Sequence, residues 1–167
     1  MEEYKKDVVY ARKNKIDKRF ANSIIEHARI LTKEIILDAK SNIKILSDSF
    51  NEYFYSSLKK EIEDFLSKDN TSIHVIVAKG HEENKLLKYF QNKFPSKFKI
   101  NFIEHDKFPK DNDTKEYVNY IVNDNKAFRY EYSDKEIHNG HVNAIANFNN
   151  EKDSNFLNDF FKKIIPN

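Results

Sequence analysis

Cysteine is absent from this 167-residue sequence, and glycine is scarce, with only Gly80 and Gly140. The lack of cysteine excludes disulfides, thiolate zinc sites and a cysteine nucleophile, and it fits a reducing compartment. Walker phosphate loops and dinucleotide-binding fingerprints need two or three clustered glycines, so both are excluded. No run approaches the ~20 apolar residues of a membrane span, and the start lacks a basic segment followed by an apolar one. We therefore expect a cytoplasmic protein without a membrane segment.

The composition is that of one globular domain. Hydrophobic residues make up 39% of the chain, including 14 Phe and 9 Tyr, and charged residues make up 34%. The net charge is only +2, but the stretch from Lys5 to Arg19 holds seven basic and two acidic residues. We expect a basic N-terminal segment over residues 1–19 and one α/β domain over residues 20–167.

The basic segment has two interpretations. It is a solvated, partly ordered segment, or it is an arm that neutralises phosphates and binds nucleic acid in a salt-sensitive way. The candidate nucleic-acid-binding residues are Lys5, Lys6, Arg12, Lys13, Lys15, Lys18 and Arg19.

The pattern of apolar residues predicts alternating helices and strands. Helices are expected over about residues 20–40, 50–65, 86–94 and 151–165, and strands over about residues 43–46, 73–78, 98–103, 117–123, 127–132 and 142–148. Asp124-Asn125-Lys126 has a tight-turn composition and predicts a hairpin. The fold class is therefore α/β, with a mixed, largely parallel sheet flanked by helices.

The histidines give weak signals. His27 and His74 are expected to be hydrogen-bonded core residues, because each lies in an apolar element. His138 and His141 offer two imidazoles three residues apart, but no third ligand is indicated nearby, so a surface turn is favoured over a metal site. We expect no metal and no cofactor.

The segment Tyr117-Val118-Asn119-Tyr120-Ile121-Val122-Asn123-Asp124 resembles, in register, the phospholipase D signature of His, any residue, Lys, four residues and Asp. In that family the His is the nucleophile or its acid–base partner, and the Lys neutralises the phosphate. Here Tyr117 and Asn119 stand in those places, and the Asp is kept as Asp124. A tyrosine is a poor nucleophile near neutral pH because its phenol is protonated, and asparagine carries no charge.

Ala146-Asn147-Phe148-Asn149 resembles the family's Gly-Ser-any-Asn segment, with Asn149 kept and Asn147 as a further vestigial position. The family places about six residues between the Asp and the Gly. Here 21 residues, Asn125 to Ile145, separate Asp124 from Ala146, which predicts an extra strand or loop between them. The order of helices and strands resembles one half of the phospholipase D fold.

This resemblance implies a catalytically degenerate phospholipase D-like protein, bacterial in character, that binds a partner protein or nucleic acid. Single-copy members of the family pair to build one active site, which implies a homodimer with Asp124 and Asn149 near the seam. Arg129 and Glu131 lie two apart on one strand and would line the vestigial cleft or form a surface ion pair. The alternatives are an active phosphodiesterase or nuclease that uses another histidine, such as His27 or His105, and nucleic-acid binding through the basic N-terminal arm.

Overall fold

The computed structural model describes residues 1–112, 115–132 and 141–165. Its helices are α1 (Glu2–Asn14), α2 (Ile25–Asp38), α3 (Glu52–Ser56), α4 (Lys59–Leu66), α5 (Lys85–Lys93), the 3-10 helix η1 (His105–Lys107) and α6 (Glu151–Ile164). Its strands are β1 (Phe20–Ile24), β2 (Asn42–Ser47), β3 (Ser72–Ala78), β4 (Phe98–Ile103), β5 (Val118–Asn123), β6 (Phe128–Tyr132) and β7 (His141–Asn147).

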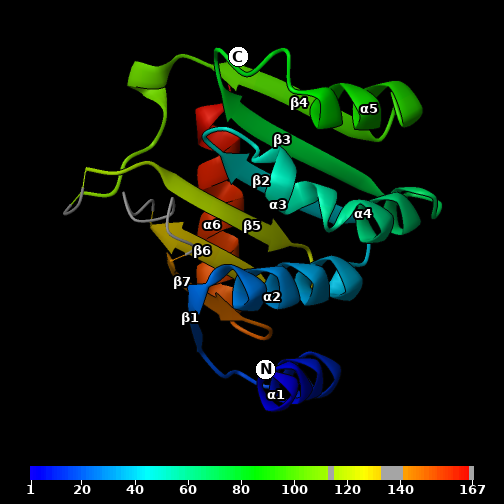
Figure 1. Cartoon of the computed structure of the whole chain (residues 1–167), viewed down its shortest axis with the longest axis vertical. Coiled ribbons are helices and arrows are strands. Elements are labelled where there is room, and N and C mark those ends of the chain that lie inside the picture. Colours follow the sequence, from blue (N-terminus) through cyan, green and yellow to red (C-terminus); the bar gives the residue numbers. More distant parts are fainter. Residues whose placement is uncertain (113–114, 133–140, 166–167) are drawn as a thin grey trace.

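The strands form one sheet in the order β1-β7-β6-β5-β2-β3-β4 (Figure 1). Strands β2, β3 and β4 are parallel, because α3, α4 and α5 carry the chain back between them. The other four pairings are antiparallel. The mixed α/β architecture is confirmed, whereas the expected predominance of parallel pairing is wrong: the hairpin β5–β6 and the entry of β1 beside β7 make the sheet largely antiparallel.

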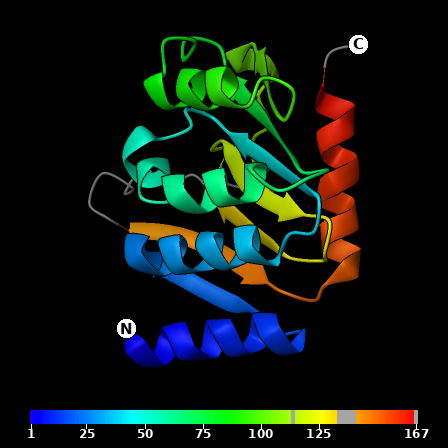
Figure 2. The ribbon, with the colours of Figure 1, turned by 90° about the vertical axis from the view of Figure 1, so that its right-hand side faces the viewer.

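Two apolar layers enclose this sheet (Figure 2). On one face α2, α3, α4 and α5 bury side chains such as Leu31, Ile62 and Phe90 against β2 and β3. On the other face α6 buries Leu157 and Phe161. Strand β3 is buried on both faces, which explains its continuous β-branched sequence. Burial of such side chains supplies roughly 25 cal/mol per Å² of apolar surface, the main stabilising contribution.

The N-terminal region departs from the prediction. Residues 20–24, expected to begin a helix, form β1, where Phe20 and Asn22 are buried and the intervening Ala21 is exposed. This alternation is the period of a strand, and the helix α2 begins only at Ile25. The basic segment is also not an extended arm, because α1 packs against α2 and buries Val8 and Ala11.

No helix within the described ranges is long and apolar enough to cross a membrane. The predicted turn at Asp124-Asn125-Lys126 joins β5 to β6, as expected. Strand β6 lies between Asp124 and Ala146, so the extra element predicted from the long spacing is present. His138 lies outside the described residues, so the structure does not describe the His138–His141 pair. Among the described residues no group of three or more metal-ligating side chains forms a candidate metal site.

Candidate functional site

Four polar side chains gather on the face of the sheet that α2, α3, α4 and α5 cover, near the end of β5 where Tyr117 lies. Asn119 on β5 pairs in register with Glu131 on β6, Glu131 with Ala144 on β7, and Ala144 with Asn22 on β1. We call Asn22, Asn119, Arg129 and Glu131 the polar cluster. Since the residues two apart on a strand share a face, Arg129 lies beside Glu131 on this same face.

Arg129 reaches across β7 to connect the cluster. Its Nη1 forms an ion pair of 2.6 Å with Glu131 Oε2, and its Nε donates to Asn22 Oδ1 at 3.2 Å. The guanidinium can cross β7 because that strand presents Ala144 and Ala146 here, which are too small to block it. The side chains of Arg129 and Glu131 are 6% and 15% exposed, so their ion pair is buried and is not the surface pair considered from sequence.

The polar cluster retains unused hydrogen-bonding capacity. Asn22 Nδ2, Arg129 Nη2 and the hydroxyl of Tyr4 are buried without a hydrogen-bond partner among the described residues. Burial raises the pKa of Tyr4 to about 12, and the charge of Arg129 acts in the opposite direction. An unpaired buried donor costs about 1–3 kcal/mol, so the donors of Asn22 and Arg129 can gain from a hydrogen bond to a further group.

The end of β2 and helix α3 close over the cluster. The amide oxygen of Asn119 accepts a 2.7 Å hydrogen bond from the backbone N–H of Asp48, directly after β2. Tyr55 of α3 is buried and stacks on Phe50 at 4.0 Å. Burial raises the pKa of Tyr55, the charge of Arg129 opposes this shift, and the charges of Glu131 and Asp48 add to it.

Tyr117 lies beside this region and contacts a histidine. Its hydroxyl is 3.3 Å from His105 Nδ1, within hydrogen-bonding distance, and the rings of His105 and His81 are 6.4 Å apart. His105 is exposed, and Gly80 lies close to its Nε2 atom. These residues follow β3 and β4, so they lie where the carboxyl ends of parallel strands commonly form a ligand-binding crevice.

The three remaining motif residues lie at the opposite end of β5. Asp124 is exposed and accepts hydrogen bonds from Lys40 N (2.9 Å), Ser41 N (2.9 Å) and Ser41 Oγ (2.6 Å). These contacts fasten the hairpin turn to the connection between α2 and β2. The structure therefore does not bring Asp124 together with Tyr117 and Asn119.

Asn147 and Asn149 also lie at this opposite end, because Asn147 pairs in register with Phe128. Asn147 Nδ2 donates to Asp17 Oδ1 at 2.6 Å, and Asn149 Nδ2 donates to the carbonyl of Lys15 at 2.8 Å. The family spacing of about six residues after Asp124 reaches Glu131 rather than Ala146. Glu131 pairs in register with Asn119, so the strand beside the motif strand β5 is β6.

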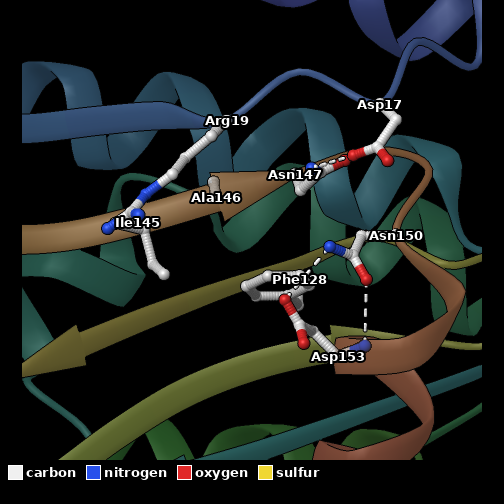
Figure 3. A pocket seen from close by; sticks show the side chains of 8 residues that line it. All are labelled: Asp17, Arg19, Phe128, Ile145, Ala146, Asn147, Asn150 and Asp153. Atoms are coloured by element: carbon white, nitrogen blue, oxygen red, sulfur yellow. Dashed lines mark hydrogen bonds between the residues drawn. The ribbon is translucent and has the colours of Figure 1, made fainter.

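A pocket of about 390 Å³ lies beside Asn147 at the start of α6 (Figure 3). Its lining residues are Asp17, Arg19, Phe128, Ile145, Ala146, Asn147, Asn150 and Asp153. The polar groups are largely occupied with one another: Asp17 accepts from Asn147, and Asn150 caps α6 by accepting from Asp153 N at 2.9 Å. The carboxylates of Asp17 and Asp153 oppose an anionic ligand, so this pocket is a poor phosphate site.

The basic N-terminal residues divide into three groups. Arg12 Nε contacts Glu34 Oε2 at 2.5 Å and Lys15 Nζ contacts Asp38 Oδ2 at 2.7 Å, and both acids lie on α2. Lys6 and Lys18 form longer, exposed pairs with Glu2 and Asp7. Among the described residues, Lys5, Lys13 and Arg19 have no ion-pair partner. The pairs of Arg12 and Lys15 thus dock α1, and the other five of the seven cations are available to another ligand.

The other histidines occupy structural positions. His27 stacks on Tyr4 at 3.7 Å between α2 and α1, and burial first, then the N-terminal charge, lower its pKa. His74 Nε2 lies 2.6 Å from Asn101 Oδ1, so it is hydrogen-bonded as expected.

No family model matches this sequence, and no curated protein matches it. Solved structures do match it in fold. TrmBL2, an archaeal chromatin protein described as showing a novel mode of DNA binding, superposes with a TM-score of 0.62 at 11% identity, over 97% of this chain and 59% of TrmBL2. NucT from Helicobacter pylori superposes with a TM-score of 0.62 at 14% identity, over 89% of this chain and 96% of NucT.

Phosphatidylserine synthase from Haemophilus influenzae Rd KW20 superposes with a TM-score of 0.61 at 10% identity, over 88% of this chain and 38% of the synthase. The matched structures carry the phospholipase D-like fold. The chain therefore has the phospholipase D-like α/β fold of these structures, and the resemblance seen in its sequence is confirmed at the level of fold.

Proposed function

We propose that this chain is a phospholipase D-like domain that binds nucleic acid and does not cleave it by the family's route. The observation that carries the proposal is the state of positions 117 and 119. Asn119 is uncharged, so it does not neutralise a phosphate, and its amide oxygen accepts a hydrogen bond from Asp48 N within the fold. Tyr117 replaces the histidine on which the family's chemistry depends.

The nearest buried cation does not replace the missing lysine. Arg129 is paired with Glu131, so the charge of the polar cluster is already balanced. Catalysis of phosphoryl transfer requires cationic groups that stabilise the charge of the transition state. Binding does not require such groups at the phosphorus atom, because surface cations and aromatic side chains bind a polynucleotide without cleaving it.

Nucleic acid is the favoured partner because TrmBL2, which matches this chain over 59% of its own length, is a chromatin protein that binds DNA. The proposal includes a homodimer, as in single-copy relatives. Light scattering of the purified chain tests the dimer: a monomeric mass at micromolar concentration contradicts it.

The direct test combines binding and turnover. Fluorescence anisotropy with labelled oligonucleotides should show salt-sensitive binding, and the same samples should show no cleavage over hours. A variant carrying Lys5→Ala, Lys13→Ala and Arg19→Ala tests the alternative of an N-terminal binding segment, and we expect it to retain most of the affinity. No binding by the wild type rejects the proposed function.

A second candidate function rests on the contact between Tyr117 and His105. In this alternative His105 accepts the phenol proton and the Tyr117 oxygen bonds to phosphorus. The P–O ester bond then breaks, and protonated His105 returns that proton to the leaving oxygen, which departs as an alcohol. Mass spectrometry distinguishes the two functions. A phospho-adduct on Tyr117 that disappears in Tyr117→Phe supports cleavage, whereas an unmodified chain after incubation with oligonucleotide supports binding alone.

A further inference from the structure

Tyr53 and Arg29 form an unusual surface feature. Tyr53, on α3, is 71% exposed, although large aromatic side chains are normally buried. The guanidinium carbon of Arg29, on α2, lies 4.8 Å from the centre of the Tyr53 ring. The guanidinium of one helix thus forms a cation–π contact with an exposed aromatic ring of another helix.

This feature lies on the solvent side of the helix that covers the polar cluster. Residues two apart in a helix point in nearly opposite directions. Tyr55 points inward, where it is 8% exposed and stacks on Phe50, whereas Tyr53 is 71% exposed and points outward. The exposed ring therefore lies on the opposite side of α3 from Tyr55.

The charge of Arg29 is not neutralised by the fold. Its Nε is buried without a hydrogen-bond partner, and no acidic side chain among the described residues pairs with it. The neighbouring carboxylate of Glu52 is engaged elsewhere, since it accepts a 2.7 Å hydrogen bond from Lys85 N. By contrast, Arg12 and Arg129 both have carboxylate partners.

We propose that Tyr53 and Arg29 form a stacking platform for a base of single-stranded nucleic acid, an inference that rests on the proposed function. The free face of the Tyr53 ring accepts a base, and the guanidinium of Arg29 contacts the adjacent phosphate. An aromatic ring beside an arginine is the combination that binds single strands without sequence preference. Bases in a duplex are already stacked, so the platform favours single strands.

The test measures the affinity of the full chain for a labelled single-stranded oligothymidylate and for a duplex of the same length. We expect Tyr53→Ala to weaken single-strand binding about tenfold and Tyr53→Phe to leave it unchanged, because stacking needs only the ring. Arg29→Gln should lower the slope of log affinity against log salt by about 0.7, the contribution of one phosphate on a single strand. The matched control is Tyr10→Ala, which removes a tyrosine that is 62% exposed on α1.

The outcomes separate this inference from the proposed function. If wild-type protein binds and Tyr53→Ala binds equally well, the platform is wrong and the proposed function stands. If Tyr10→Ala and Tyr53→Ala weaken binding equally, or if the duplex is preferred, the platform is also wrong. If wild-type protein binds neither oligonucleotide, both fail. Thermal unfolding of each variant confirms that the fold is retained.

Discussion

The two ends of strand β5 use their polar residues differently. At the Asp124 end, the side chains of Asp124, Asn147 and Asn149 form hydrogen bonds that stabilise turns and connections. At the Tyr117 end, Asn22 and Arg129 have buried donors without a partner in the part of the chain that the structure describes, and Tyr53 and Arg29 lie at the surface. The motif residue that is kept, Asp124, therefore has a structural role, whereas the end at which the motif residues have changed is the one at which we propose ligand binding.

The largest expected effect comes from breaking the polar cluster. Glu131→Leu leaves Arg129 buried without its carboxylate partner, so the free energy of unfolding should fall by about 3–5 kcal/mol. Chemical denaturation measures it. The double variant Arg129→Met/Glu131→Leu should recover most of that loss because no buried charge remains unpaired. A single variant as stable as the wild type would contradict the buried ion pair.

A smaller effect is expected at the other end of β5. Asp124→Ala removes three hydrogen bonds from the α2–β2 connection and should cost about 2 kcal/mol in unfolding free energy. The nucleic-acid affinity of the Asp124→Ala variant should equal that of the wild type. Asp69→Ala is the matched control, since Asp69 is an exposed aspartate without a partner among the described residues. Loss of binding in Asp124→Ala without loss of stability would reverse our comparison of the two ends.

The smallest expected effect is a pH dependence of the free energy of unfolding, which arises at His27 where α1 packs on α2. Burial lowers the pKa of His27, so the unfolded chain binds more protons than the folded chain just below pH 6.5. Stability is therefore fully present above that pH and should fall slightly as the pH drops through it. Thermal unfolding between pH 5 and 7.5 measures the change. His27→Gln should flatten the profile, and an unchanged slope in that variant would show that other groups cause it.

The sequence predicted those parts of the fold that depend on local pattern. The β-branched run Ile73–Ala78, the Asp124-Asn125-Lys126 turn and the apolar face of α6 all specify their elements within a few residues. Strand β1 was missed because Phe20 and Ile24 also fit a helical spacing. The parallel predominance was wrong because strand order depends on contacts between distant residues.

The candidate site was harder to predict for the same reason. Asn22 and Arg129 are far apart in sequence and meet only because β1 enters the sheet beside β7. Arg129 and Glu131 were singled out by their spacing, but their burial was not visible. The exposure of Tyr53 could not be predicted from the sequence, because an aromatic residue in an amphipathic helix is usually expected in the core. The six-residue spacing after Asp124 was the one available clue that Glu131, rather than Ala146, lies beside Asn119.

The central claim is that nucleic acid binds at the Tyr117 end of the sheet beside α3. Titrating isotope-labelled protein with a single-stranded oligonucleotide and following the backbone amide signals by NMR tests it most directly. We predict that the chemical shifts of Asp48, Tyr53 and Asn119 change together and saturate, while those of Asp124 and Asn149 do not change. Shifts confined to Asp124, Asn149 or α1 would contradict it.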